Sequence, residues 1–119
     1  MFAEVKEMLP NPISGDDYDA QIILWIEAGV QELTSTTEIR LDGTVDISRE
    51  PVLDENDNVT GWKIVDNSDI DDKLVFAVLA LYVCMNIGNP PNYSNLLGAF
   101  NSLKGSMQRS SKYNGGGRT

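Results

Sequence analysis

The pattern of apolar and polar positions predicts helices towards both ends of the chain and strands between them. Residues 2–9 have apolar side chains at helical spacing and precede two prolines, so a short helix is expected there. A second, amphipathic helix is expected to begin near Asp16, where carboxylates favour the positive end of a helix dipole, and to end near Thr34. Its apolar face consists of Ile22, Ile23, Ile26, Val30 and Leu33. Gly29 lies within this helix, where glycine is less favourable than alanine by about 1 kcal/mol. Either this loss of helix stability is tolerated or another backbone approaches closely there.

Residues 38–67 have the pattern of a β-hairpin or short meander. Short apolar runs flank the polar cluster of residues 54–58, whose side chains tolerate tight turns. Trp62, Ile64 and Val65 are expected to anchor the hairpin onto the helices. Because the segment has too few apolar residues for a core of its own, it is predicted to be an insertion on a helical body.

Residues 74–85 form the longest apolar stretch, without a charged residue or a turn former. This composition predicts a central core helix covered by other helices on all sides. Ser68 and Asp71 resemble a capping box before it, and Gly88 is a candidate for its C-terminal cap. A last amphipathic helix is expected to begin near Tyr93 or Ser94. Its apolar face consists of Leu96, Leu97, Phe100, Leu103 and Met107.

These elements predict a mainly α fold, a small helical bundle around one apolar core helix, with a short β-hairpin insertion and a flexible C-terminal tail. Residues 1–108 are expected to form a single domain. Residues 109–119 contain one large apolar side chain and three consecutive glycines, too little to offset the entropy of ordering the backbone. The residues expected in the core include Ile26, Val30, Leu74, Val78, Leu81 and Phe100.

Charge is distributed very unevenly along the chain, whose formal net charge is −9. Residues 1–72 hold all 18 acidic residues and four basic ones, a charge of −14, whereas residues 73–119 hold five basic residues and no acidic one. One interpretation is a solvated acidic surface beside a slightly basic helix pair. The other is that acidic and basic surfaces of neighbouring copies meet, or that the basic tail binds an acidic partner.

Histidine is absent and Cys84 is the only cysteine, so histidine-based triads, disulfide frameworks and Cys/His zinc sites are excluded. Cys84 is predicted to be an inert core residue. The carboxylates of Asp69, Asp71 and Asp72 are explained by helix capping rather than by acid–base catalysis. No catalytic residue and no cofactor is predicted.

The acidic cluster of residues 54–58 begins with the Asp-x-Asn-x-Asn spacing of an EF-hand calcium loop. Position six of such a loop would be Val59 instead of glycine, and position twelve would be Val65 instead of glutamate. The cluster is therefore interpreted as an acidic turn, and no metal site is predicted.

The first residues lack the features of a signal peptide, which predicts a protein that is cytoplasmic when made. The apolar residues 74–87 would span about 21 Å as a helix, less than a bilayer's hydrocarbon layer of about 30 Å. Basic residues near the C-terminus could touch nucleic acid, but four charges give only weak, salt-sensitive binding. These residues, with a neighbouring aromatic one, are Lys104, Arg109, Lys112, Tyr113 and Arg118.

The order of elements resembles that of the head-to-tail connector, or adaptor and head completion, proteins of tailed bacteriophages. The likeness is carried by residues 16–20 with the helix to Leu33, and by residues 71–74 and 80–84 with the Gly-Asn-Pro-Pro-Asn-Tyr motif at 88–93. Together these regions, 16–33 and 71–93, cover about a third of the chain.

The resemblance implies a structural virion protein without enzymatic activity. It implies a homo-oligomeric ring, expected to be dodecameric, that docks beneath the portal protein, joins the DNA-filled head to the tail and extends the DNA channel. The ring would be assembled in the host cytoplasm, would lie in the virion neck away from any membrane, and would offer a platform to the next neck or tail protein. Portal binding would fall to the C-terminal segment and its residues Lys104, Arg109, Lys112, Tyr113 and Arg118, with non-specific DNA contact in the channel.

Two other classes of function remain open at this point. A small acidic helical regulatory module that binds a protein partner, similar to an antitoxin, would have the same composition but would be a monomer or dimer. A hydrolase or transferase would require a deep pocket with converging carboxylates.

Overall fold

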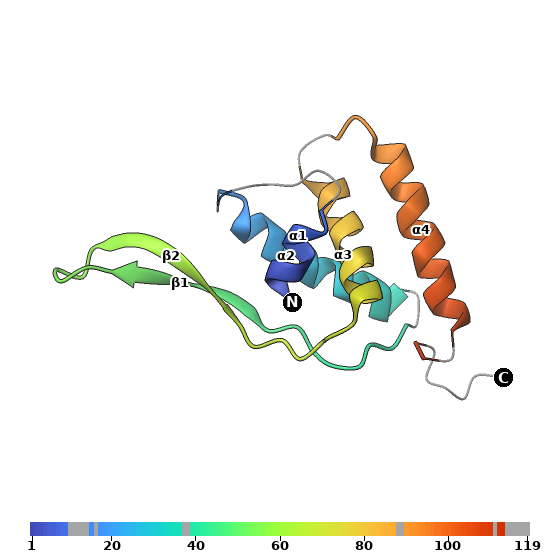
Figure 1. Cartoon of the computed structure of the whole chain (residues 1–119), viewed down its shortest axis with the longest axis horizontal. Coiled ribbons are helices and arrows are strands. Elements are labelled where there is room, and N and C mark those ends of the chain that lie inside the picture. Colours follow the sequence, from blue (N-terminus) through green and yellow to red (C-terminus); the bar gives the residue numbers. More distant parts are fainter. Residues whose placement is uncertain (10–14, 16, 37–38, 88–89, 111, 114–119) are drawn as a thin grey trace.

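The computed structural model describes residues 1–9, 15, 17–36, 39–87, 90–110, 112 and 113. Within these residues, four helices and one antiparallel hairpin follow each other along the chain (Figure 1). In order they are α1 (Phe2–Glu7), α2 (Asp19–Gln31) with a π-helical turn η1 (Glu32–Thr36), β1 (Ile47–Leu53), β2 (Val59–Asp66), α3 (Lys73–Asn86) and α4 (Tyr93–Arg109). The predicted mainly α fold with a hairpin insertion is confirmed.

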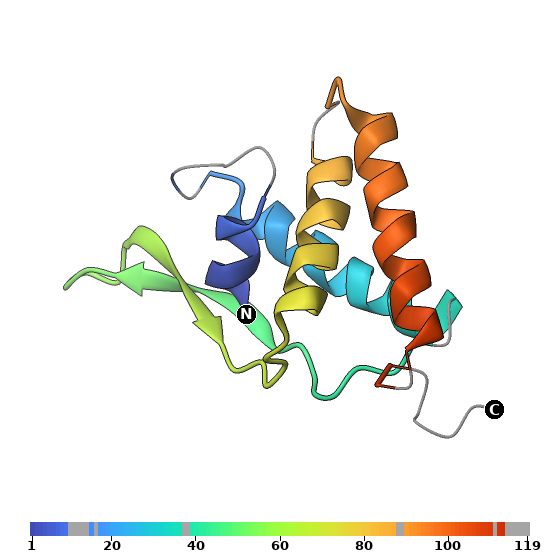
Figure 2. The same cartoon turned by 45° about the vertical axis from the view of Figure 1, so that its right-hand side comes forward.

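Helix α3 lies at the centre of the helical body. It contacts α1, α2 and α4, and Figure 2 shows α3 and α4 side by side with α2 crossing near them. The interior is apolar because each helix turns its hydrophobic face towards α3. Fully buried side chains include Ile22, Ile26, Leu79, Val78 and Met107.

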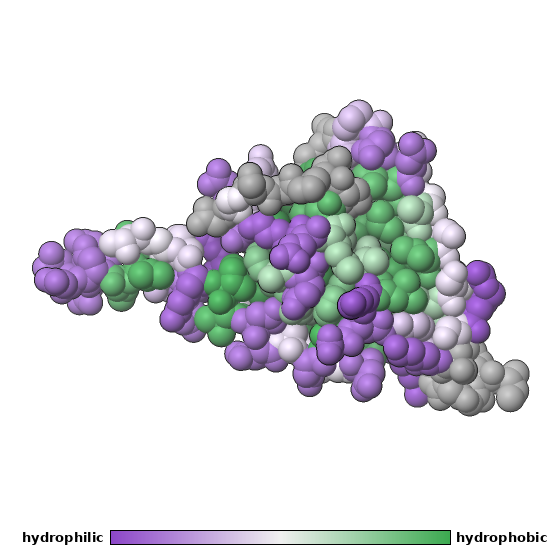
Figure 3. Space-filling view, viewed as in Figure 1, coloured by the Kyte–Doolittle hydropathy of each residue, from purple (hydrophilic) through white to green (hydrophobic). Residues whose placement is uncertain are grey.

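One side of α3 is less covered than predicted. Leu74, Ala77 and Leu81 share a face of the helix at spacings of three and four residues, and all three are only half-buried. Figure 3 shows apolar surface over α3 between α1 and α4. The expectation that other helices enclose α3 completely is therefore wrong, because none of the described helices or strands covers this gap. We call these three residues the apolar stripe of α3.

Some of the residues predicted to lie in the core are fully buried in the structure, and others are partly buried. Ile26, Val78 and Phe100 are buried, as expected. Val30, Leu74 and Leu81 pack against the core but remain partly exposed, because each lies at the edge of its helix's packed face. Amphipathic periodicity identifies the side of a helix that packs, and it does not show where a neighbouring helix ends.

Two helix starts differ from the prediction. Helix α2 begins at Asp19 rather than near Asp16, which lies outside the described residues. The buried Asp19 carboxylate forms an ion pair with Lys6 Nζ at 2.7 Å. Helix α3 is capped by Asp72, whose Oδ1 accepts hydrogen bonds from the N–H groups of Leu74 at 2.9 Å and Val75 at 3.4 Å.

The predicted capping box at Ser68 is wrong. The Ser68 Oγ instead accepts a hydrogen bond from the Asp46 N–H at 2.8 Å, and the Asn67 N–H donates to the Asp46 carbonyl, also at 2.8 Å. This part of the chain is extended because it pairs with the segment that leads into β1, so α3 cannot start earlier. The predicted glycine cap at Gly88 lies outside the described residues.

Gly29 marks the place where α2 and α3 approach most closely. A Cβ at this position would lie 2.8 Å from Leu79 Cδ2 and 3.2 Å from the Tyr82 ring. Aromatic contacts then link three helices, because the Tyr82 ring lies 6.2 Å from Trp25 of α2 and 5.3 Å from Phe100 of α4. The atoms that approach Gly29 closely belong to the side chains of Leu79 and Tyr82 and not to another backbone, which was the alternative raised by the sequence.

The hairpin projects from the helical body as an arm, which we define as β1, β2 and the turn between them (Figure 1). Its base is held where Ile47 is buried and Ile64 is half-buried, and where the Asp66 carboxylate accepts a hydrogen bond from the Phe2 N–H at 2.7 Å. The arm accounts for an elongated molecule of 60 × 34 × 20 Å. Trp62 does not anchor it to the helices, as was predicted, because it lies beyond the base and is 51% exposed.

Candidate functional site

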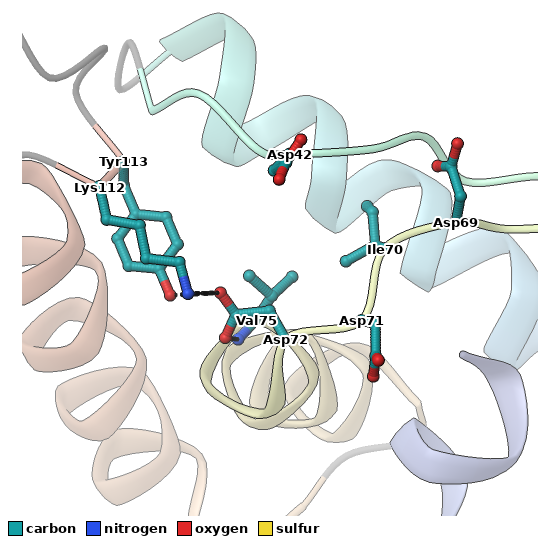
Figure 4. Close-up of a pocket in the computed structure, with 8 residues that line it drawn as sticks. All are labelled: Asp42, Asp69, Ile70, Asp71, Asp72, Val75, Lys112 and Tyr113. Carbon is teal, nitrogen blue, oxygen red and sulfur yellow. Dashed lines mark hydrogen bonds and ion pairs between the residues drawn. The ribbon is translucent and has the colours of Figure 1, made fainter.

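The C-terminal segment returns to the start of α3. Helix α4 ends at Arg109, and the chain then turns so that Tyr113 Oη donates a hydrogen bond to Asp72 Oδ2 at 2.5 Å (Figure 4). Lys112 Nζ forms an ion pair with the same oxygen at 2.9 Å. The Tyr113 carbonyl also accepts a hydrogen bond from the Arg40 N–H at 2.5 Å, and its side chain is 5% exposed.

These contacts bear on the prediction of a tail that begins at residue 109 and holds no conformation of its own. Within the described part of that segment, the buried Tyr113 and the ion pair of Lys112 with Asp72 anchor the turn on the body. The composition of the segment gives its number of apolar side chains. It does not show that Asp72, 41 positions away, accepts a hydrogen bond from Tyr113. Arg118 and the other residues after Tyr113 lie outside the described part of the chain.

The pKa shifts of Asp72, Lys112 and Tyr113 favour the protonation states that their hydrogen bonds require. Burial opposes ionisation of Asp72, but hydrogen bonds from Tyr113, Lys112 and the first N–H groups of α3 outweigh it and lower the pKa of the carboxyl group. Its charge raises the pKa of the Lys112 ammonium. Burial and the bond to Asp72 raise the pKa of the Tyr113 phenol. At neutral pH, therefore, Asp72 is the acceptor and the other two groups are donors.

A hollow of about 150 Å³ opens beside this cluster. It is lined by Asp42, Asp69, Ile70, Asp71, Asp72, Val75, Lys112 and Tyr113. Figure 4 shows that its carboxylates do not converge: Asp71 points away from the others, and Asp72 faces Lys112. Asp69 is already bonded to the Thr44 N–H at 2.5 Å. The arrangement holds the chain together and gives no group poised for acid–base chemistry.

Asp69, Asp71 and Asp72 therefore do not act together as helix caps. Asp72 caps α3, as predicted for the cluster, whereas Asp69 fixes the segment before β1 and Asp71 is exposed. Among the described residues, no group of three histidine, cysteine or carboxylate side chains is placed to hold a metal ion. Cys84 is buried on α3, the position expected of a core residue.

The residues predicted to bind the portal are not gathered in one place. Lys112 and Tyr113 meet at Asp72, whereas Lys104 lies along α4 with its Nζ 5.2 Å from the centre of the Phe100 ring. Arg109 is exposed at the end of α4, with Nη2 3.5 Å from Ser106 Oγ. The structure thus joins two of the predicted residues to the body and leaves the two on α4 accessible in part or in full.

The arm carries a surface that the sequence analysis missed. Pro51 pairs with Trp62 and Leu53 with Val59, so these four side chains share one side of the hairpin, which we call the arm face. Leu53, Val59 and Trp62 are each more than half exposed. Figure 3 shows this apolar surface on the arm, between its hydrophilic tip and the helical body.

The sequence did contain a signal for the arm face. Pro51, Val52 and Leu53 are three consecutive apolar residues at the end of β1, and β2 contains Val59 and Trp62. Val52 interrupts the period-two alternation that would identify a face, so only the register shows which of these side chains share a side.

The turn at the end of the arm is stabilised by its own first residue. Asp54 Oδ1 accepts hydrogen bonds from the N–H groups of Asn56 at 2.8 Å and Asn58 at 2.9 Å, and Asp57 has a positive φ of 62°. These bonds lower the pKa of the Asp54 carboxyl group. The turn is an Asx-type turn, which agrees with its interpretation as an acidic turn between strands.

Across the described part of the chain, no helix combines the length and the hydrophobicity that a membrane crossing requires. No protein-family model matches the chain, and neither the curated proteins nor the solved structures that were searched contain a match.

Proposed function

We propose that the protein is a structural component of a tailed-phage neck, a ring beneath the portal that joins the head to the tail and extends the DNA channel. One observation carries the proposal: all acidic residues precede Lys73, and the arm with its acidic turn projects away from the two helices that contain no acidic residue. The arm ends in an acidic turn, and α4 lies at the other end of the long axis (Figure 1).

This polarity favours contacts between unlike surfaces of neighbouring copies. Residues 73–119, which form α3, α4 and the C-terminal segment, contain no acidic residue, whereas residues 1–72 contain all 18. A contact between two different surfaces forms a ring when the repeated rotation returns to the first copy, and an open filament when it does not. The resemblance to head-to-tail connector proteins supports the same arrangement, including a ring of about twelve copies.

The structure changes which residues are proposed to reach the portal. Lys112 and Tyr113 bind Asp72 of their own chain, so they position the end of the chain instead of serving as free ligands. The portal and the next neck or tail protein are the proposed partners. The proposed portal contact therefore moves to the residues after Tyr113, with Arg118, while Lys104 and Arg109 remain available for non-specific contact with DNA phosphates.

The test is to measure the mass and shape of the purified chain alone and with a candidate portal protein, by light scattering and negative-stain electron microscopy. We expect a ring that co-elutes with the portal. Truncation after Asn114 should weaken this co-elution while circular dichroism stays unchanged, because the contacts of Tyr113 remain. Substitution of Arg118 by Lys is the matched control and should retain binding.

A monomer or dimer that never joins the portal would contradict the proposal and favour the regulatory module similar to an antitoxin. An enzyme is not proposed, because the carboxylates around the described hollow point apart and Asp72 is occupied by its own chain.

A further inference from the structure

We propose that the arm docks onto a second copy of this chain, with its arm face against the apolar stripe of α3. The inference rests on the proposed function, since it names the two surfaces by which neighbouring copies of the ring would meet.

The apolar side chains of the arm face are largely exposed to solvent in the described chain. Trp62 and Leu53 are each 51% exposed and Val59 is 54% exposed, and the register makes them neighbours. The Arg49 guanidinium lies 4.7 Å from the centre of the Trp62 ring and holds it in place. A two-stranded hairpin is marginally stable by itself, and tryptophan is enriched among the residues that dominate binding energy at interfaces.

The opposite side of the arm has a different character. Glu50 and Lys63 form an ion pair there, with 3.7 Å between Lys63 Nζ and Glu50 Oε2, and Ser48 lies on the same side. Val52 also lies on this side and is 41% exposed, so the two sides differ in that one carries Trp62, Leu53 and Val59 and the other carries the ion pair. A group of exposed apolar side chains on one side of a hairpin is typical of a surface that binds another protein chain.

Charge identifies the occupant as another copy of the same chain. The tip of the arm carries the carboxylates of Asp54, Glu55 and Asp57, which the acidic residues 1–72 of a neighbour would repel. The apolar stripe lies on α3, and neither α3 nor α4 contains an acidic residue. The exposed Lys73 stands one turn before Ala77 on the same helix. Asp71 and Asp72 immediately precede Lys73, so the charge match rests on Lys73 itself, whose ammonium would pair with a carboxylate of the tip.

The arm cannot cover the stripe of its own chain. Figure 1 shows it extending away from α3 along the long axis of the molecule, which measures 60 Å. The contact must therefore be made between copies, with the arm of one on the helices of the next. Each copy then donates one arm and receives another, which is the head-to-tail type of contact that can close into a ring.

The first experiment compares two exposed positions on opposite sides of the arm. Trp62→Ser removes the main apolar side chain of the arm face, and Val52→Ser is the control, since Val52 is 41% exposed on the other side. Mass is measured by sedimentation velocity against a monomer of 13.1 kDa, and folding by circular dichroism. We expect W62S to need at least about tenfold more protein to assemble, and V52S to assemble like the wild type.

The second experiment places a carboxylate on the stripe. Ala77→Glu should prevent assembly by repelling the acidic tip and disrupting the apolar contact, and Ala77→Ser is the control with a small side chain. A mixture of W62S and A77E should form dimers that neither variant forms alone, because the arm of A77E is intact and the stripe of W62S is intact. Such complementation requires two different surfaces in one contact.

Equal assembly by W62S and wild type, unchanged assembly by A77E, or a wild type that stays monomeric up to about 1 mM would overturn the docking proposal. These outcomes are separate from the test with the portal. A wild-type ring that binds the portal while W62S also assembles would refute the arm contact alone. Copies that dock through the arm but never bind a portal would refute the proposed function alone.

Discussion

Asp72 uses its two carboxylate oxygens for different parts of the chain. Oδ1 caps α3, and Oδ2 accepts the hydrogen bond from Tyr113 and the ion pair from Lys112. A single side chain thereby couples the start of the central helix to the end of the chain. Its two donors differ in exposure, because Tyr113 is buried and the Lys112 side chain is 64% exposed.

This difference predicts unequal effects of removing the two donors. Tyr113→Phe removes a hydrogen bond to a charged acceptor at a buried position and should lower the free energy of unfolding by about 1–2 kcal/mol. Lys112→Ala removes a solvent-exposed ion pair and should cost less than about 1 kcal/mol. Urea unfolding of both variants measures this order, and a larger loss for K112A than for Y113F would contradict it.

The carboxyl groups of Asp66 and Asp72 predict sensitivity to acid. Burial opposes ionisation of Asp66, but hydrogen bonds from the Phe2 N–H, the N-terminal ammonium and Ser68 outweigh it and lower its pKa to about 2. A carboxyl group whose pKa is lower in the folded state contributes stability above its unfolded pKa, which is lost as the pH falls towards the folded value.

Stability should therefore decrease between about pH 5 and pH 2, by about 1–2 kcal/mol for Asp66 after allowing for solvent screening. Urea midpoints measured across this range test the expectation. The Asp66→Asn variant should be less stable at pH 7 but should lose less on acidification. Identical pH profiles for D66N and the wild type would refute the role of Asp66 at the base of the arm.

At the scale of elements, the packing of α2 on α3 depends on one missing side chain. Leu79 is fully buried, and a Cβ on Gly29 would lie 2.8 Å from its Cδ2 atom. A leucine enclosed by a packed core cannot move away at low cost. Gly98 on α4 is the opposite case, because nothing lies within 4 Å of a Cβ placed there.

The two glycines therefore predict opposite effects of the same substitution. Gly29→Ala should destabilise the protein by about 1–3 kcal/mol, since overpacking exceeds the gain in helix propensity. Gly98→Ala should stabilise it by about 0.5–1 kcal/mol, because only the propensity changes. Thermal unfolding followed by circular dichroism measures both, and stabilisation by G29A would show that α2 and α3 are less closely packed than described.

At the scale of the whole molecule, the division of charge predicts that salt weakens any assembly of copies. Contacts between an acidic tip and basic helices act over distances comparable to the Debye length of about 10 Å at 0.1 M salt. Sedimentation at about 0.05 M and 0.5 M sodium chloride should show a shift towards smaller species at the higher concentration. An assembly unaffected by salt would refute the electrostatic part of the contact, although the arm face could still contribute.

Much of the fold could be predicted from the sequence because its information is local. Apolar spacing identified all four helices, and the turn residues around Asp54 identified the hairpin. The candidate contact surfaces were harder to predict. Trp62 was expected to pack on the helices, since a large aromatic residue is usually buried, and its distance from the arm's base depends on the register and length of the strands.

The sequence by itself determined the helical and extended segments and the separation of charge along the chain, since these follow from periodicity and from counting residues. Only the tertiary structure decided which surfaces stay uncovered and which distant residues meet. The bond of Tyr113 to Asp72 and the half-exposed Leu81 are examples, because each depends on where separate helices end in space. Such contacts join residues far apart in the chain, and no local pattern encodes them.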